Sequence, residues 1–203
     1  KKCFEIEQIC VETNTMPLQD YLNCRNYSFI VKILANQVFS PIYKLTKKIG
    51  ISWYDFSKAF TEVIQDDNFE GEFKNLYNDF CKESVNELFN TKEETTNFYS
   101  SEKNYELLNK GDIGENLAAK YTAKSLLILD DVLTTIFYVI NNKFEHVLGD
   151  KFNDIISSSE TWLKNLYMIN EIIDGNYNFN KNSKYNLEMD FDFPQWLSKT
   201  DMP

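Results

Sequence analysis

The feature that most constrains the fold is a stretch near the middle of the chain that is apolar almost all round a helix. It covers residues 126–140, within a helix that we expect over residues 115–148, with a bend. A helix that is hydrophobic on every side belongs at the centre of a bundle. The stretch is interrupted by Asp130 and Asp131 and is shorter than the roughly 20 residues of a bilayer span. We therefore expect a buried helix and no membrane span.

Most of the remaining chain carries helical periodicity, with apolar residues at three- and four-residue steps. Capping residues and glycines separate the runs. Ser52 is placed to cap a helix, and Gly50 is placed to end the one before it. The patterns predict further helices at about residues 17–39, 41–49, 53–66, 70–89, 102–109 and 151–174. Since 43% of the residues are hydrophobic, a chain of 203 residues can bury a substantial core.

Two segments near the ends are instead strand candidates: an N-terminal one with the short apolar run Ile9-Cys10-Val11, and a C-terminal one that alternates apolar and polar residues. They cover residues 4–12 and 185–193, and Pro194 would stop the second. An isolated strand leaves backbone groups unpaired, so we expect the two to pair. The predicted fold class is mainly α, a multi-helix bundle with a small β element formed by the N-terminal and C-terminal strands.

The domain organisation follows from the start of the chain and from one polar run. The chain opens in a strand-like segment without an initiator Met or a signal peptide, so we expect residues 1–203 to be a single helical domain cut from a longer polypeptide. Residues 90–101 are polar and lack periodicity, which indicates a linker between sub-lobes 1–90 and 102–203. A loop within one bundle is the alternative.

Charge and cysteine usage exclude several function classes. The formal net charge is −10, from 21 Lys and Arg against 31 Asp and Glu. Such a surface repels phosphate backbones, so we expect no nucleic-acid partner. The cysteines are Cys3, Cys10, Cys24 and Cys81, which form no C-x-x-C pair and no cluster-binding triplet. We expect reduced, structural thiols and a cytoplasmic protein.

The most chemically suggestive pair is Asp130 with Asp131, because a carboxylate in a low-dielectric interior can have a raised pKa and act as an acid or base. Adjacent helical residues point about 100° apart, however, so both cannot face one substrate. We expect one to face solvent and the other to bond a neighbouring helix or loop. A hydrolase that uses either residue is a lesser hypothesis. His146 is the only histidine, and one isolated histidine is no metal site.

The segment Gly111-Asp112-Ile113-Gly114-Glu115-Asn116 has two interpretations. Glycines before a helix can expose N–H groups to a phosphate. The segment lacks the Lys-Ser/Thr end of a P-loop and the third glycine of a dinucleotide fingerprint. We therefore expect Asp112 and Glu115 to form a start for the next helix that resembles a capping box.

Four short motifs together resemble the region that follows the catalytic barrel in cobalamin-binding-domain radical SAM proteins. They are spread over nearly the whole chain, in the order of that family. The motifs are Val11-Glu12-Thr13, Met16 with Asp20-Tyr21, Gly111 with Gly114-Glu115-Asn116, and Phe191-Asp192-Phe193-Pro194.

The resemblance implies a non-catalytic C-terminal accessory domain of a cobalamin-dependent radical SAM enzyme. Its partners would be the barrel and cobalamin domains of the same polypeptide, and it would help close the substrate side. The 4Fe-4S cluster, S-adenosylmethionine and cobalamin would belong to that parent enzyme. No catalytic, cofactor-binding or metal residue is assigned here. Apolar residues at 4–11 are candidates for a surface that the barrel covers, or for an ordinary strand covered by this chain's helices. A free-standing helical protein-interaction module is the alternative function.

Overall fold

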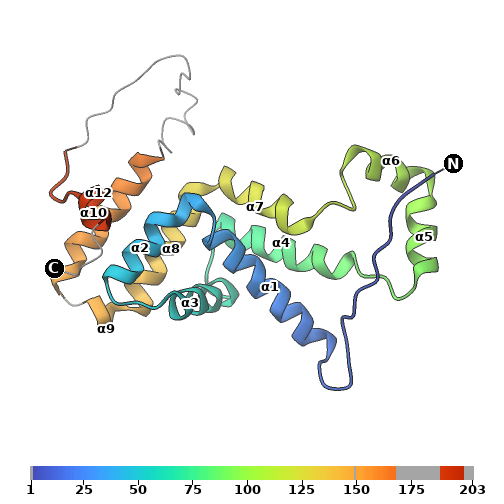
Figure 1. Cartoon of the computed structure of the whole chain (residues 1–203), viewed down its shortest axis with the longest axis horizontal. Coiled ribbons are helices and arrows are strands. Elements are labelled where there is room, and N and C mark those ends of the chain that lie inside the picture. The colour runs from blue at the N-terminus through green and yellow to red at the C-terminus, as the bar shows by residue number, and fades with distance from the viewer. Residues whose placement is uncertain (1, 149, 168–187, 199–203) are drawn as a thin grey trace, which may run out of the picture. The chain divides into compact units, whose positions relative to one another are not determined.

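The computed structural model describes residues 2–148, 150–167 and 188–198 and is mainly helical, as predicted (Figure 1). The chain divides into two compact units, each made of two stretches of sequence. Unit 1 comprises Lys1–Ile33 and Asn75–Lys124, whereas unit 2 comprises Leu34–Lys74 and Ser125–Pro203. The division that the sequence predicted, into consecutive lobes of residues 1–90 and 102–203, therefore differs from these units, each of which combines two separate stretches.

Unit 1 is built around aromatic rings from three of its helices. Its helices are α1 (Leu18–Leu34), α4 (Glu72–Asn86), α5 (Lys92–Ser100), α6 (Glu102–Lys110) and α7 (Leu117–Leu127); Leu34, the first residues of α4 and the last of α7 belong to unit 2. Phe29 of α1 stacks on Phe80 of α4 with 3.9 Å between ring centroids. Tyr121 of α7 meets both rings edge-on. All three rings are buried, so they form the core that joins these helices.

The polar run that indicated a linker contains a helix instead, since residues 92–100 form α5. Thr91 caps this helix, because its Oγ1 atom accepts a hydrogen bond from the backbone N–H of Glu94 (3.1 Å). The Glu94 carboxylate in turn accepts one from the backbone N–H of Asn90 (3.0 Å). This reciprocal arrangement resembles a capping box, and it satisfies free donors at the helix start. The helix expected at residues 102–109 is confirmed as α6.

The N-terminal strand prediction is wrong for the residues that the structure describes. Residues 2–12 have no regular secondary structure, and Thr13 and Met16 form a tight turn with an isolated bridge. Local partners hold the segment on unit 1: the Phe4 ring lies 5.7 Å from that of Tyr99, and Lys2 pairs with Glu102. Helices of the same unit therefore contact this part of the segment.

The predicted C-terminal strand at residues 185–193 is also not found in its described part. Residues 185–187 lie outside the described residues, residues 188–192 are not strand, and α12 (Phe193–Ser198) begins where the strand should end. Asp192 Oδ1 accepts a hydrogen bond from the backbone N–H of Gln195 (2.9 Å), and Pro194 occupies the first turn. Asp192 and Pro194 therefore form a helix start, which the alternating polarity concealed.

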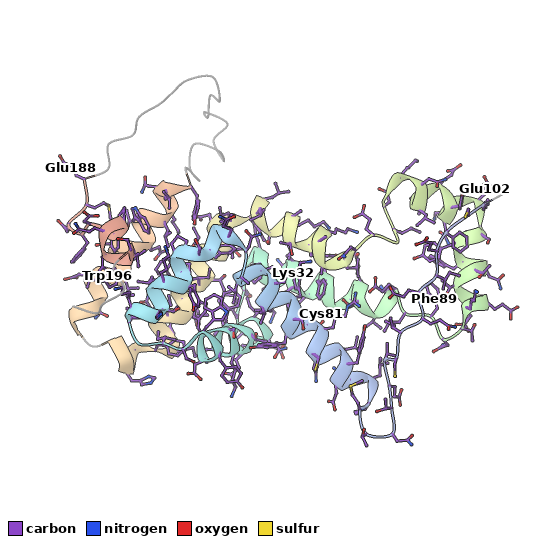
Figure 2. The ribbon with its side chains drawn as sticks, viewed as in Figure 1. Lys32, Cys81, Phe89, Glu102, Glu188 and Trp196 are labelled. Atoms are coloured by element: carbon purple, nitrogen blue, oxygen red, sulfur yellow. The ribbon has the colours of Figure 1, made fainter. Side chains whose placement is uncertain are left out.

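Unit 2 packs shorter helices around the apolar stretch that the sequence singled out. Its elements are η1 (Gln37–Phe39), α2 (Ser40–Lys48), α3 (Trp53–Gln65), α8 (Leu129–Lys143), α9 (Glu145–Leu148), α10 (Asp150–Leu166) and α12. Helix α8 packs against α3 and α10, and Figure 2 shows side chains crowded between α2, α3 and α8. The buried residues of α8 include Val132, Leu133, Ile136, Phe137, Val139 and Ile140. The prediction of a central helix is thus confirmed for α8, whereas Leu126 and Leu127, which precede it in the predicted stretch, are exposed.

The single helix expected over residues 115–148 is divided into α7, α8 and α9. Ile128 separates α7 from α8 with φ −116° and ψ 36°, and Phe144 separates α8 from α9 with φ −123° and ψ 15°. Both residues leave the helical region of backbone conformation. The expected bend is therefore two breaks, neither of which involves Gly or Pro.

Candidate functional site

The candidate site is a groove in unit 2, where the chain turns through η1 into α2. Asn36 caps η1, because its Oδ1 atom accepts a hydrogen bond from the backbone N–H of Val38 (3.1 Å). Pro41 follows in the first turn of α2, where its missing N–H leaves no unmade helix bond. The chain therefore changes direction within a few residues.

A short connection then fixes the start of α3 next to α2. Gly50 has a φ of 80°, a left-handed conformation that favours glycine. The backbone N–H of Ile51 donates to the carbonyl of Thr46 (2.8 Å), which ends α2 in a Schellman-type turn. Ser52 Oγ accepts a hydrogen bond from the backbone N–H of Asp55 (3.0 Å) and starts α3. The predicted roles of Gly50 and Ser52 are confirmed.

The groove that results has a volume of about 320 Å³ and is mostly apolar. It is lined by Leu34, Ala35, Asn36, Phe39, Ser40, Tyr43 and Trp53. The Tyr43 ring stands edge-on to the Trp53 ring, with 5.3 Å between centroids. Tyr43 is 49% exposed and Tyr54, next to Trp53, is 65% exposed. Large aromatic side chains at the surface of a hollow are typical of protein-binding sites.

The stretch of sequence that forms the groove lacks acidic residues, although the chain as a whole is acidic. No Asp or Glu occurs between Asp20 and Asp55; at the chain's average of 31 acidic residues in 203, a stretch of this length would contain about five. Lys44 and Lys47 are exposed on α2, and Lys47 lies one turn after Tyr43 on the same face. Sequence reasoning missed this site, and the acid-free stretch is the signal that could have found it.

The aspartates singled out in the sequence have separate structural roles. Asp131 Oδ2 accepts a hydrogen bond from the backbone N–H of Phe73 (2.7 Å) at the start of α4. Gly71 directly precedes α4, where a capping side chain would normally stand. The Asp131 carboxylate fills that space, since a Cβ atom on Gly71 would lie only 3.2 Å from Asp131 Oδ2. Asp130 forms an ion pair with Lys164 of α10 (3.2 Å) and is partly exposed. The two carboxylates therefore serve different contacts, as their adjacent positions on a helix require.

The glycine-rich segment contains a helix end and a helix start. Gly111 ends α6 with a φ of 79°, and Gly114 has a φ of 75°. Asn116, not Asp112 or Glu115, caps α7: its Oδ1 atom accepts a hydrogen bond from the backbone N–H of Ala119 (3.1 Å). The capping-box prediction is therefore wrong in its residues.

The cysteines and the histidine are not brought together in the described part of the chain. Cys3, Cys10 and Cys24 are exposed and Cys81 is partly buried; Figure 2 shows Cys81 on α4. Burial raises the pKa of the Cys81 thiol. His146 lies in α9 and is exposed. Across residues 2–148, 150–167 and 188–198, no three His, Cys, Asp or Glu side chains are grouped as potential metal ligands.

Unit 1 has a second polar cluster, between α1 and α4. The Arg25 guanidinium donates to Tyr21 Oη (3.3 Å), to Ser84 Oγ (3.1 Å) and to Glu87. One turn before Glu87, Glu83 accepts hydrogen bonds from α7. A cavity of about 410 Å³ lies beside this cluster and is lined partly by Arg25, Lys32 and Glu87. Because Arg25 and Glu87 bind each other there, the cluster holds the helices together.

The two glutamates of this cluster respond differently to their surroundings. Burial raises the pKa of the Glu87 carboxyl, although the Arg25 guanidinium acts in the opposite direction. Burial also acts to raise the pKa of Glu83, but hydrogen bonds from Tyr121 and Lys120 outweigh it and lower that pKa. The Tyr121 pKa is raised, by burial and by its hydrogen bond to Glu83. Glu83 is therefore held ionised, whereas folding favours the protonated form of Glu87.

In the described residues, no helix combines the length and apolar character that a membrane crossing requires. Comparison with protein-family models, with curated proteins and with solved structures finds no match to this chain.

Proposed function

We propose that this chain is a helical docking domain, which acts by binding the surface of another protein. The observation that carries the proposal is the groove between η1, α2 and α3, with Tyr43 and Trp53 in its wall. Tyr and Trp dominate binding energy at protein interfaces because each adds a large apolar area at a small cost in side-chain entropy. Tyr43 is half-exposed, so a partner that covered it would remove much apolar surface from water.

The docking function has two forms, which differ in the partner. In the first, supported by the sequence motifs, the chain is the accessory domain of a cobalamin-dependent radical SAM enzyme, and it docks on the barrel or the cobalamin domain. The cluster, S-adenosylmethionine and cobalamin would then be bound elsewhere in that polypeptide. In the second, the chain is a free-standing interaction module.

The contacts of Asp130 and Asp131 favour docking over hydrolysis. Asp131 caps the start of α4, and Asp130 pairs with Lys164. A general base needs a lone pair directed at the substrate. Both aspartates already have structural partners, since Asp131 binds a backbone N–H and Asp130 pairs with an ammonium group.

The gene sequence upstream of the codon for Lys1 tests which form applies. A C-x-x-x-C-x-x-C motif on an upstream barrel supports the accessory form; its absence supports the free-standing form. If the barrel is encoded, titration calorimetry of the 203-residue chain against the upstream polypeptide should give a Kd of about 1 μM or tighter. No measurable binding would contradict the accessory form.

A matched pair of tyrosine variants tests the role of the groove. Tyr43→Ala should weaken binding about tenfold, the scale of an interface hot spot. Tyr138→Ala is the control, because Tyr138 also lies in unit 2 and is 45% exposed, close to the 49% of Tyr43, but contacts Phe69 outside the groove. Equal effects of the two variants would remove the groove from the proposal.

A further inference from the structure

We infer that the groove between η1, α2 and α3 binds an acidic, amphipathic segment of a partner protein, with one large apolar side chain in the hollow. This inference rests on the proposed docking function and names the class of partner. The groove is the place of binding, and the lysines of α2 select the charge.

The size and the apolar lining of the groove suit one large apolar side chain. Its volume of about 320 Å³ lies at the lower limit of ligand pockets, which span about 300–1,000 Å³. The wall is formed by buried Leu34 and Phe39 and by the Tyr43 and Trp53 rings. Such a hollow suits an apolar anchor such as Leu, Phe or Trp, which is how partner segments bind hydrophobic grooves.

The charge beside the groove selects the rest of the segment. Residues 40–58 contain four lysines and one acidic residue, Asp55. The Asp55 carboxylate accepts a hydrogen bond from Ser52 Oγ (2.6 Å). Lys44 and Lys47 are exposed on α2 beside Tyr43. Carboxylates that flank the anchor of a bound segment can therefore pair with these ammonium groups. The pairing provides specificity and a faster association rate more than affinity.

A short segment suits this patch better than an anionic membrane does. At physiological salt the Debye length is about 8 Å, so a segment in the groove responds chiefly to the nearby lysines. A membrane presents negative charge over a wide plane, and the chain with its net charge of −10 is repelled by it. The local basic patch and the acidic whole therefore point to a small acidic partner segment.

Selection from a random library of 15-residue peptides on the full 203-residue chain tests the inference. The enriched peptides should combine one Leu, Phe or Trp with several Asp or Glu. Their affinity, measured by fluorescence anisotropy, should fall about tenfold in Tyr43→Ala and should also fall in the double variant Lys44→Gln, Lys47→Gln. Tyr138→Ala and Lys143→Gln, which change comparable side chains elsewhere in unit 2, should leave it within about twofold.

Several outcomes would overturn the inference. Enriched peptides that are basic or neutral would refute the acidic partner, and binding insensitive to Tyr43→Ala would refute the groove while leaving the docking function intact. No enrichment at all would refute the inference, whereas the accessory form of the proposed function is tested separately by binding to the upstream polypeptide. Stronger binding to phosphatidylserine vesicles than to any peptide would assign the patch to membranes, and dimerisation abolished by Tyr43→Ala would assign it to a second copy.

Discussion

Unit 1 and unit 2 both place acidic side chains between helices, but they use them differently. In unit 1, Glu83 and Glu87 bind side chains of α7 and α1. In unit 2, Asp130 pairs with Lys164 in the same way, but Asp131 instead binds the backbone N–H of Phe73. A pair of side chains depends on the charge of both partners, whereas a backbone cap determines where a helix begins. The difference predicts unlike responses to mutation and to pH.

The two units also carry separate natural probes. All four cysteines lie within the sequence of unit 1, and all three tryptophans, Trp53, Trp162 and Trp196, lie within that of unit 2. Tryptophan fluorescence therefore follows unit 2, and the reactivity of the partly buried Cys81 follows unit 1. Unfolding of the two units can therefore be followed separately.

The largest effect should come from removing a buried ring in either unit. Phe80→Ala in unit 1 and Phe60→Ala in unit 2 remove side chains that are 1% and 0% exposed. Each should lower the free energy of unfolding by about 3–5 kcal/mol, through lost burial and the cavity left behind. Urea unfolding measures the change, followed by Cys81 reactivity for Phe80→Ala and by tryptophan fluorescence for Phe60→Ala. A loss below about 1 kcal/mol in either unit would show that its ring packing is wrongly described.

A smaller loss should follow removal of the backbone cap in unit 2. Asp131→Ala leaves the Phe73 N–H without its acceptor and should cost about 1–2 kcal/mol. Asp130→Ala is the matched control, because it breaks only a partly exposed ion pair with Lys164 and should cost about 0–1 kcal/mol. Urea unfolding followed by tryptophan fluorescence compares them. The cap assignment fails if Asp130→Ala is the more damaging change.

Opposite pH dependence should distinguish the two glutamates of unit 1. The lowered pKa of Glu83 contributes stability above its ordinary value of 4.5, and this contribution is lost as the pH falls through the folded-state value. The raised pKa of Glu87 contributes stability below 4.5, which is lost as the pH rises through its folded-state value. Stability relative to wild type should therefore change with pH in opposite directions for Glu83→Gln and Glu87→Gln. Urea unfolding between pH 3 and pH 7 measures both, and parallel curves would contradict the assignment.

The smallest effect concerns the close approach of Gly71 to Asp131. An added Cβ at Gly71 lies 3.2 Å from Asp131 Oδ2, so the carboxylate must shift by a few tenths of an ångström. Gly71→Ala should cost less than about 1 kcal/mol in the wild type and even less in Asp131→Ala. A double-mutant cycle measures this coupling. Additive effects would mean that the two positions do not interact.

The sequence predicts the helices well where an apolar face and a local end signal coincide. Gly50 and Ser52 mark the connection between α2 and α3, and the structure confirms both. It predicts poorly where two local signals compete. The segment around Asp192 alternates in polarity like a strand, yet Asp192 and Pro194 form a helix start. Residues 92–100 lack an apolar stripe, yet the Thr91 cap starts a helix there.

The candidate site was less accessible from the sequence than the helices were. The groove joins the end of α1 to the start of α3, and no motif marks its residues. The net charge of −10 did not indicate the lysines of α2, because it is a sum over the whole chain. The cap on α4 could not be predicted from the residues around the helix start, because its acceptor, Asp131, is 60 positions from Gly71 in the sequence.

The contact between these two positions makes the cost of a substitution at one depend on the residue at the other during evolution. A residue larger than glycine at position 71 meets the carboxylate of Asp131, and loss of Asp131 leaves the start of α4 without an acceptor. Once Asp131 is lost, however, Ser or Asp at position 71 supplies a cap of its own, in space that has just become free. Because the carboxylate can shift for a small side chain at position 71, a path that changes Gly71 first loses less stability than a path that loses Asp131 first.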